Sequence, residues 1–136
     1  MITVIKDFLI ERIDPSFIIL FGSYATGCTH SESDVDIAFC KEFHSLSAYD
    51  VFILARELAI TIDRHVDLID LDEASTVFKA QVFNDGKAIY VKHQHMLDEY
   101  RMRALSMYAQ LNEERFEIIE GIYKRGSIYE KRGYSE

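Results

Sequence analysis

Residues 17–39 read FIILFGSYATGCTHSESDVDIAF, and the order of residue types in this stretch decides the fold. The first five residues, 17–21, are apolar on both faces and end at Gly22, as expected of a short strand buried in the middle of a sheet. Residues 22–33 change to Gly, Ser, Thr, Cys and His and predict a loop. Residues 34–39 alternate between apolar and acidic or small side chains, which predicts a second, half-buried strand.

Helical patterns surround these two strands. Apolar residues spaced by three and four predict a helix over residues 2–13, which Asp14-Pro15 stops, and another that Ser47 caps together with Asp50. A shorter helix is expected to end at Gly86. The second helix is expected to end at Ile62, and the shorter helix to cover residues 75–84. Two further strands are expected, a third over 65–70 and a fourth, at the edge of the sheet, over 88–91.

A long amphipathic helix is expected from His95 onward. Its apolar residues follow alternating steps of three and four, which is the spacing of a helix that lies along another helix, in its own core, in a second copy or in a partner. The tail from Lys124 has four basic and two acidic residues, and it is either a solvated end or a docking arm. The helical stripe consists of Leu97, Tyr100, Ala104, Met107, Leu111, Ile118 and Ile122.

These elements predict an α/β fold in one domain: a small mixed sheet with flanking helices and a long C-terminal helix. We expect the core to span residues 1–92, the helix that contacts a partner or a second copy to span 93–123, and the basic tail to span 124–136.

The composition excludes several classes of protein. Fifteen Lys and Arg residues against 23 Asp and Glu give a net charge of −8 over 136 residues, so a surface that grips nucleic acid directly is not expected. Cys28 and Cys40 form neither a disulfide framework nor a zinc pattern and are interpreted as buried thiols of a reducing compartment. No signal peptide and no membrane-spanning run is found, so a cytoplasmic protein is expected.

Three carboxylates fall on two of the expected strands. Asp34 and Asp36, two residues apart, share one face of the second strand, and Asp67 lies on the third strand opposite the face of Val66 and Leu68. If the two strands are neighbours, the three carboxylates converge and repel one another unless a divalent cation is present. Mg²⁺ prefers such oxygen ligands completed by water and substrate phosphate, so the pattern predicts a two-metal phosphoryl-transfer site.

The loop that follows the first strand supplies a place for phosphate. Gly22 allows a backbone to approach a phosphate closely, and the hydroxyl and amide of Ser23 can donate hydrogen bonds to its oxygens. Gly27 gives the loop a second flexible point, and His30 and Glu32 either contact nucleotide or are solvated.

Other candidate residues have a structural interpretation. His93 and His95 are expected to be surface histidines near the start of the long helix, because no acidic residue accompanies them. Asp70 and Asp72 are expected to be strand-end and helix-cap carboxylates. Cys28 has no basic neighbour in the sequence to lower its pKa and is not expected to be a nucleophile.

Gly22-Ser23, ten further residues and then Asp34-Val35-Asp36 resemble the Gly-Ser-x10-Asp-x-Asp signature of the polymerase β-like nucleotidyltransferase superfamily, with Asp67 matching its third carboxylate. The chain is most similar to the minimal nucleotidyltransferases (MNT), the antitoxin partners of HEPN ribonuclease toxins. The resemblance spans Ile2 to Val91. One departure is Thr26, which stands where many members have an Arg that contacts phosphate.

The resemblance implies an activity and a partner. Asp34 and Asp36 would hold Mg²⁺ ions that bridge the triphosphate of ATP, Asp67 would ligate the second metal and help to deprotonate the acceptor, and Gly22-Ser23 would seat the β and γ phosphates. The acceptor would be a tyrosine hydroxyl of a cognate HEPN toxin, which receives AMP and is neutralised while pyrophosphate leaves. A homo-oligomer or hetero-oligomer is compatible with the long helix.

Two other functions remain open from the sequence. The first is a nucleotidyltransferase for small molecules of the aminoglycoside type, in which a second domain or subunit closes the acceptor pocket. The second is an antitoxin that acts by binding alone, which the intact carboxylate triad disfavours. A neighbouring gene for a short helical protein with Arg-x4-His-x-Tyr would favour the toxin partner.

Overall fold

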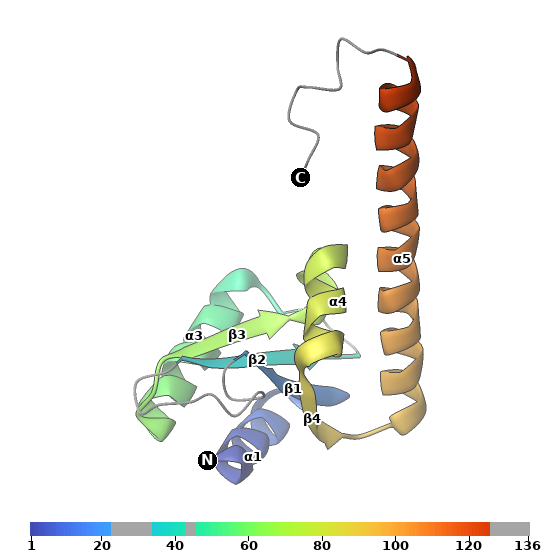
Figure 1. The fold of residues 1–136 in the computed structure, drawn as a ribbon. Helices are drawn as coiled ribbons and strands as arrows, with labels where there is room; N and C mark the ends of the chain where they lie inside the picture. Colours follow the sequence, from blue (N-terminus) through green and yellow to red (C-terminus); the bar gives the residue numbers. More distant parts are fainter. Residues whose placement is uncertain (23–33, 43–45, 126–136) are drawn as a thin grey trace.

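A computed structural model describes residues 1–22, 34–42 and 46–125, with side chains described as far as Glu114. Helices and strands are interspersed along the chain (Figure 1). The elements, in chain order, are α1 (Ile2–Ile13), β1 (Phe17–Phe21), β2 (Val35–Cys40), α3 (Ala48–Ile62), β3 (Val66–Asp70), the 3₁₀ helix η1 (Leu71–Glu73), α4 (Thr76–Asp85), β4 (Lys87–Val91) and α5 (Gln94–Arg125).

The four strands form one mixed sheet in the order β3-β2-β1-β4. β1 is antiparallel to both β2 and β4, whereas β2 and β3 are parallel. The predicted α/β fold with a mixed sheet is therefore confirmed, and so is the edge position of β4. The structure adds η1, which no pattern in the sequence predicted.

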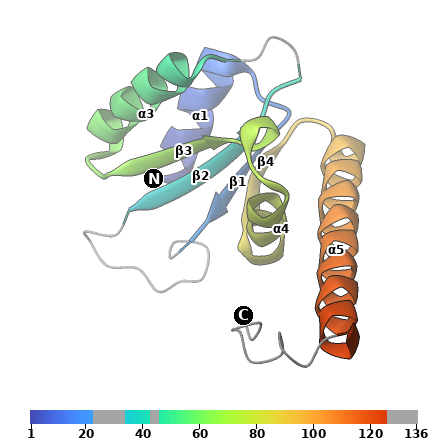
Figure 2. The same ribbon diagram turned by 90° about the horizontal axis from the view of Figure 1, so that it is seen from above.

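Among the described residues, two helices cover each face of the sheet, as the view from above shows (Figure 2). On one face α1 and α3 pack against the alternate residues Val35, Ile37 and Phe39 of β2, as the alternation predicted. On the other face α4 and α5 pack against a second cluster that includes Ala38 and Cys40. Because successive side chains of a strand point to opposite faces, Asp36 belongs to the face of Ala38 and Cys40.

The helix ends follow the signals in the sequence. The Ser47 hydroxyl accepts a hydrogen bond from the Asp50 backbone N–H at 3.1 Å, and α1 ends at Asp14, whose left-handed backbone precedes Pro15. α4 ends at Gly86 as predicted, although this glycine has a φ of −85°. A Cβ at Gly86 would overlap Ile19 and the Val82 carbonyl, so close packing rather than backbone conformation requires glycine there.

α5 is much longer than the helix it packs on. Its 32 residues extend about 48 Å at 1.5 Å per residue, whereas the ten residues of α4 cover about 15 Å. Leu97 and Ala104 are buried against the body, but Met107 is 49% exposed, so the predicted stripe is only partly covered in the described side chains. Figure 1 shows the upper half of α5 extending beyond α4.

None of the helices in the described ranges combines the length and the apolar character needed to cross a membrane.

Candidate active site

The parallel pairing of β2 with β3 places two predicted site residues directly beside each other. Asp36 is the register partner of Asp67, and Val35 is the partner of Val66. Asp34 immediately precedes β2, where the Val35 backbone N–H donates to the His65 carbonyl at 2.8 Å. Because neighbouring residues in register share a face, Asp36 and Asp67 project from the same side of the sheet. The structure thus places Asp36 beside Asp67, and Asp34 lies close enough for its charge to act on Asp36.

The electrostatics of the cluster fit a cation site. Burial raises the pKa of Asp36, and the negative charges of Asp67 and then Asp34 raise it further. Carboxylates that disfavour one another's charge gain from a divalent cation, and Mg²⁺ takes one or two carboxylates together with substrate phosphates and water. Across the ranges that the structure describes, no three Asp, Glu, His or Cys side chains form a ready-made cage for a metal ion. The adjacent carboxylates of Asp36 and Asp67 supply the number of protein ligands that Mg²⁺ takes when substrate phosphate and water complete its coordination.

Gly22 borders the carboxylates from the other side. β1 ends where Phe21 pairs with Asp36, and Gly22 follows with a φ of +74°, in the left-handed region that favours glycine. A Cβ at this position would overlap the Asp36 carboxylate. The sequence pattern indicated that Gly22 gives room to a phosphate, but it did not reveal that Gly22 also gives room to Asp36.

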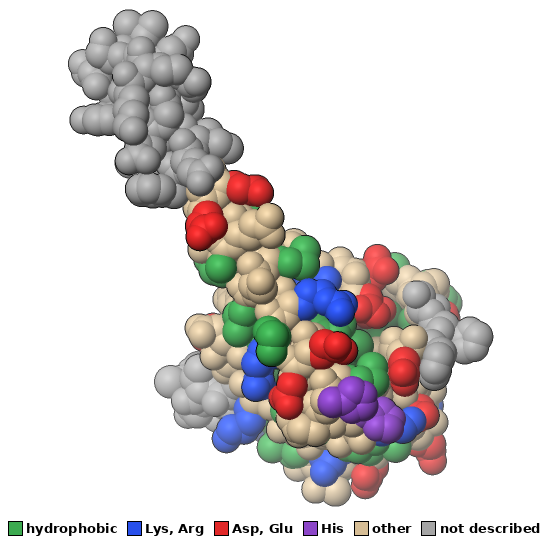
Figure 3. Space-filling model, turned by 90° about the vertical axis from the view of Figure 1, so that its right-hand side faces the viewer, with side chains coloured by type: hydrophobic (Ala, Val, Ile, Leu, Met, Phe, Trp, Pro, Cys, Tyr) green, Lys and Arg blue, Asp and Glu red, His purple; other side chains and the backbone are tan. Residues whose placement is uncertain are grey.

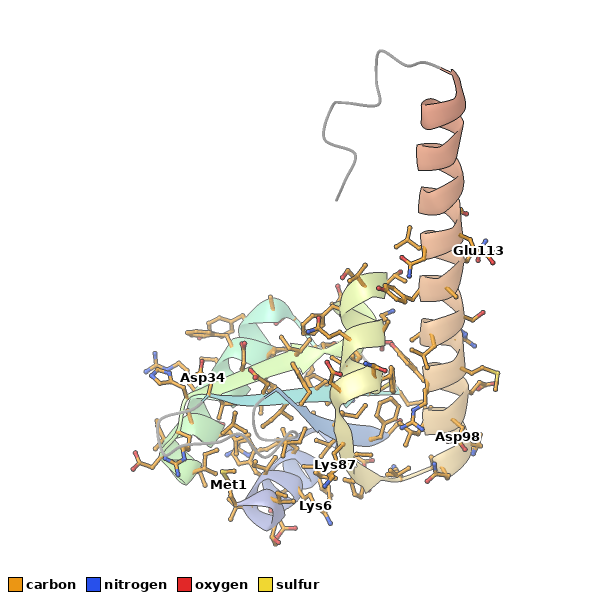
Figure 4. The ribbon with its side chains drawn as sticks, in the orientation of Figure 1. Met1, Lys6, Asp34, Lys87, Asp98 and Glu113 are labelled. Atoms are coloured by element: carbon orange, nitrogen blue, oxygen red, sulfur yellow. The ribbon has the colours of Figure 1, made fainter. Side chains whose placement is uncertain are left out.

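The end of the sheet that carries these residues lies away from the long helix. Figure 4 shows Asp34 at the end of the sheet opposite α5, whereas Glu113 lies far along α5. The α4 and α5 helices contact the same face of the sheet through Phe17, Ile19 and Cys40, further from the carboxylates. α4 comes closer to them at one point, because the ring of its Phe78 lies 5.6 Å, centroid to centroid, from the ring of Phe21, the register partner of Asp36.

Several predicted loop residues lie outside the described residues. These are Ser23, which was expected to bind phosphate, and Thr26, Gly27, Cys28, His30 and Glu32.

Two further carboxylates have structural contacts. Asp70 is buried, and its side chain accepts a hydrogen bond from the Asp72 backbone N–H at 3.0 Å, which caps η1. Burial raises the pKa of the Asp70 carboxyl group. Asp72 accepts a hydrogen bond from the Tyr100 hydroxyl at 2.6 Å, and burial followed by this bond raises the pKa of Tyr100. The prediction of a strand-end and cap role is confirmed for Asp70. Asp72 instead connects η1 to α5 through its hydrogen bond with Tyr100.

The remaining candidates behave as structural residues. Cys40 is buried, as predicted, and burial together with the nearby Asp72 and Asp70 raises the pKa of its thiol to about 12. His93 and His95 are exposed next to the start of α5, as expected, with ring centroids 5.8 Å apart.

Comparisons with known proteins agree with this geometry. The family model described as polymerase beta, nucleotidyltransferase, matches residues 3–95. The protein adenylyltransferase MntA of Shewanella oneidensis is 39% identical over 119 residues, which cover 87% of this chain and 84% of that protein.

Solved structures show the same similarity in three dimensions. A toxin–antitoxin complex with AMP-PNP contains a chain that is 36% identical, with a TM-score of 0.80, coverage of 90% of this chain and 98% of that one. A complex of tri-AMPylated Shewanella oneidensis HEPN toxin with MNT antitoxin contains a chain that is 33% identical, with a TM-score of 0.74, coverage of 90% of this chain and 95% of that one.

Proposed function

Because the chain belongs to the polymerase β nucleotidyltransferase family, we propose that it is an antitoxin that transfers AMP from ATP to a tyrosine hydroxyl of a cognate HEPN toxin. The observation that carries this proposal is the pairing of Asp36 with Asp67 beside Gly22. The relatives support the choice of acceptor, since one is a protein adenylyltransferase and another is bound to a tri-AMPylated HEPN toxin.

In the proposed reaction, the tyrosine oxygen attacks the α-phosphorus of ATP. The new bond joins this oxygen to phosphorus, the bond between the α-phosphorus and the bridging oxygen breaks, and pyrophosphate leaves with the electron pair. The tyrosine proton passes to the Asp67 carboxylate, which faces the site and is exposed to solvent. Attack and departure are roughly in line, so the acceptor and the leaving group occupy opposite sides of the α-phosphorus.

Each predicted site residue has a place in this scheme. Gly22 and Ser23 seat the β and γ phosphates at the end of β1. Asp34, Asp36 and Asp67 are the residues that would hold Mg²⁺, which when bound neutralises the charge of the triphosphate. Asp36 lies between Gly22 and Asp67, because β2 lies between β1 and β3.

The helix α5 is the proposed contact with the toxin. Its exposed apolar side chains include Met102, Leu105 and Met107, and Figure 3 shows hydrophobic side chains distributed over the described part of this helix. In this organisation residues 1–92 are the catalytic core, residues 93–123 hold the partner, and the basic tail 124–136 steers an acidic surface toward it. In this proposal the antitoxin and its toxin act in the cytoplasm, where ATP is available.

The test is transfer of label from α-labelled ATP to the purified toxin in the presence of Mg²⁺. We expect label on a toxin tyrosine, located by mass spectrometry, together with loss of the toxin's ribonuclease activity. Inhibition of the toxin without any label would favour an antitoxin that acts by binding alone. Label on a small hydroxyl compound in preference to the toxin would favour the small-molecule enzyme.

A further inference from the structure

A groove runs between α3 and the edge strand β3. Its volume is about 470 Å³, and its lining includes Phe52 and Arg56 from α3, His65 just before β3, and Val66 to Leu68 of β3. The floor is largely aliphatic, because α3 presents three alanines and Val51 to it. Asp67 belongs to the same lining, so the groove borders the proposed catalytic site.

The rim of the groove carries an exposed aromatic ring. Phe52 is 54% exposed, and the Arg56 guanidinium carbon lies 5.8 Å from its ring centroid. Phe52 is one of the large apolar side chains left in solvent by the part of the chain that the structure describes. An aromatic ring beside a guanidinium is a common anchor in protein interfaces, because both groups bury a large area and Arg also donates hydrogen bonds.

The order of the strands indicates whether the acceptor or the leaving pyrophosphate lies on the side of this groove. Gly22 follows β1, Asp36 lies on β2, and Asp67 lies on β3, so the three residues cross the sheet in that order. With the β and γ phosphates seated beside Gly22, pyrophosphate leaves on the β1 side. In-line displacement then requires the acceptor oxygen to approach from the β3 side, past Asp67 and the groove.

The groove and the Asp67 carboxylate lie on the two sides of the β3 edge. Val66 and Leu68 contact the core on the α3 side, whereas Asp67, between them, points to the opposite face. A segment that lies along this edge can therefore present one side chain to Asp67 and place its neighbours in the groove.

We propose that this groove is the acceptor subsite: it receives the side chains that flank the target tyrosine of the toxin, with Phe52 and Arg56 as specificity-determining residues. This inference rests on the proposed function. The lining favours an apolar side chain that packs against the alanines. It also favours a carboxylate or carbonyl oxygen next to Arg56.

The first test is photo-crosslinking in the complex of the full chain with the toxin. The photoreactive residue p-benzoylphenylalanine replaces Phe52 in one variant and Tyr49 in a matched variant. Tyr49 is also an exposed aromatic residue of α3, at 69%, but it does not line the groove. We expect position 52, and not position 49, to crosslink to the toxin peptide that contains the modified tyrosine. Equal crosslinking at both positions, or none at 52, would overturn the proposal.

The second test separates the acceptor from ATP. Phe52→Ala and Arg56→Ala should each raise the KM for the toxin roughly tenfold, as truncation of an interface anchor does, while the affinity for AMP-PNP stays that of the wild type. Arg56→Lys should recover only part of the loss, since it restores the charge but not the planar donor group. Tyr49→Ala should match the wild type.

Either of two results in the second test would contradict the proposal. A weaker affinity for AMP-PNP would assign the groove to the nucleotide, and an unchanged KM for the toxin would leave the groove without an acceptor role. Labelling of the toxin by the wild type tests the proposed function alone, so a failure there is distinguishable from a failure of these variants.

Discussion

The Asp36 carboxylate occupies the space where a side chain at Gly22 would stand. The two residues come from adjacent antiparallel strands, since Gly22 follows the residue that pairs with Asp36. One glycine therefore meets two requirements, a left-handed backbone and room for a carboxylate of the proposed metal site.

Gly22→Ala should reduce AMP transfer far more than it reduces the folded fraction. An L-residue in the left-handed region costs about 1 to 2 kcal/mol, and the added methyl group displaces Asp36 from its place beside Asp67. The measurement is the transfer rate per folded molecule, with the folded fraction taken from a denaturant titration.

Gly86→Ala is the matched control for this variant. Here too the methyl group meets neighbours, Ile19 and the Val82 carbonyl, but the backbone is ordinary and none of the three atoms nearest to that methyl group belongs to a carboxylate. Overpacking costs about 1 to 3 kcal/mol, so this variant should lose stability and keep its rate per folded molecule. An equal loss of rate in both variants would contradict the special role of Gly22.

Asp34→Asn combined with Asp36→Asn should abolish AMP transfer and leave the fold intact. Both residues lie at one end of β2, outside the two core clusters. The folded chain raises the pKa of Asp36, so it holds this proton more tightly than the unfolded chain, and stability falls as the pH rises above the ordinary range of a carboxyl group. The variant should therefore be more stable than the wild type at pH 7 without Mg²⁺, and this advantage should vanish in acid.

Thermal melts at pH 7 and at acid pH, beside the labelling assay, check this prediction. Transfer at the wild-type rate would exclude the two residues as metal ligands. A large loss of stability at pH 7 would show that they hold the fold rather than a cation.

Asp67→Ala should lower the rate of AMP transfer, whereas Asp70→Ala should lower the stability of the fold. Loss of Asp67 removes both a metal ligand and the proposed proton acceptor, which costs at least ~10² in rate. Loss of Asp70 removes the cap of η1, which costs about 1 kcal/mol of stability and leaves the rate per folded molecule close to that of the wild type. Single-turnover labelling and denaturant titration separate the two effects, and a slow Asp70→Ala enzyme would contradict the assignment.

The sequence predicted most of the fold because local patterns determine it. The alternation of β2, the apolar run of β1 and the Ser47 cap all depend on residues within a few positions of one another. The convergence of Asp36 with Asp67 was expected only if β2 and β3 were neighbours, and the structure shows them as parallel neighbours.

Features that depend on distant contacts could not be predicted. The overlap of a Gly22 side chain with Asp36 depends on the register of β1 with β2, and the packing of Gly86 on Ile19 depends on how α4 meets the sheet. The bond from Tyr100 to Asp72 joins residues 28 positions apart. The groove at Phe52 and Arg56 arises only when α3 lies beside β3, because spacing along α3 alone does not tell which helical face remains open.

Cys40 should make stability fall at alkaline pH. Burial raises the pKa of its thiol from the ordinary value of 9.0 to about 12, so between these values the folded chain holds a proton that the unfolded chain has released. The free energy of unfolding should therefore decrease as the pH rises through this window. In Cys40→Ala the decrease should be shallower, measured by denaturant titration from pH 8 upward, and an unchanged slope would contradict the burial of a protonated thiol.

Ile118→Glu combined with Ile122→Glu should release the toxin and leave the fold unchanged. In the sequence these residues continue the spacing of Leu97, Ala104 and Leu111, and they belong to the last third of α5. Figure 1 shows the C-terminal half of this helix extending beyond α4. Two buried charges in a helix interface carry a large desolvation cost, whereas the same charges on a solvated helix cost little. The variant should thus melt like the wild type, lose the toxin in pull-down and fail to label its tyrosine.

A homodimer that covers the same stripe would instead give a smaller particle in size-exclusion chromatography for the variant, with toxin binding retained. Label confined to Tyr123, Tyr129 or Tyr134 of this chain would indicate self-modification.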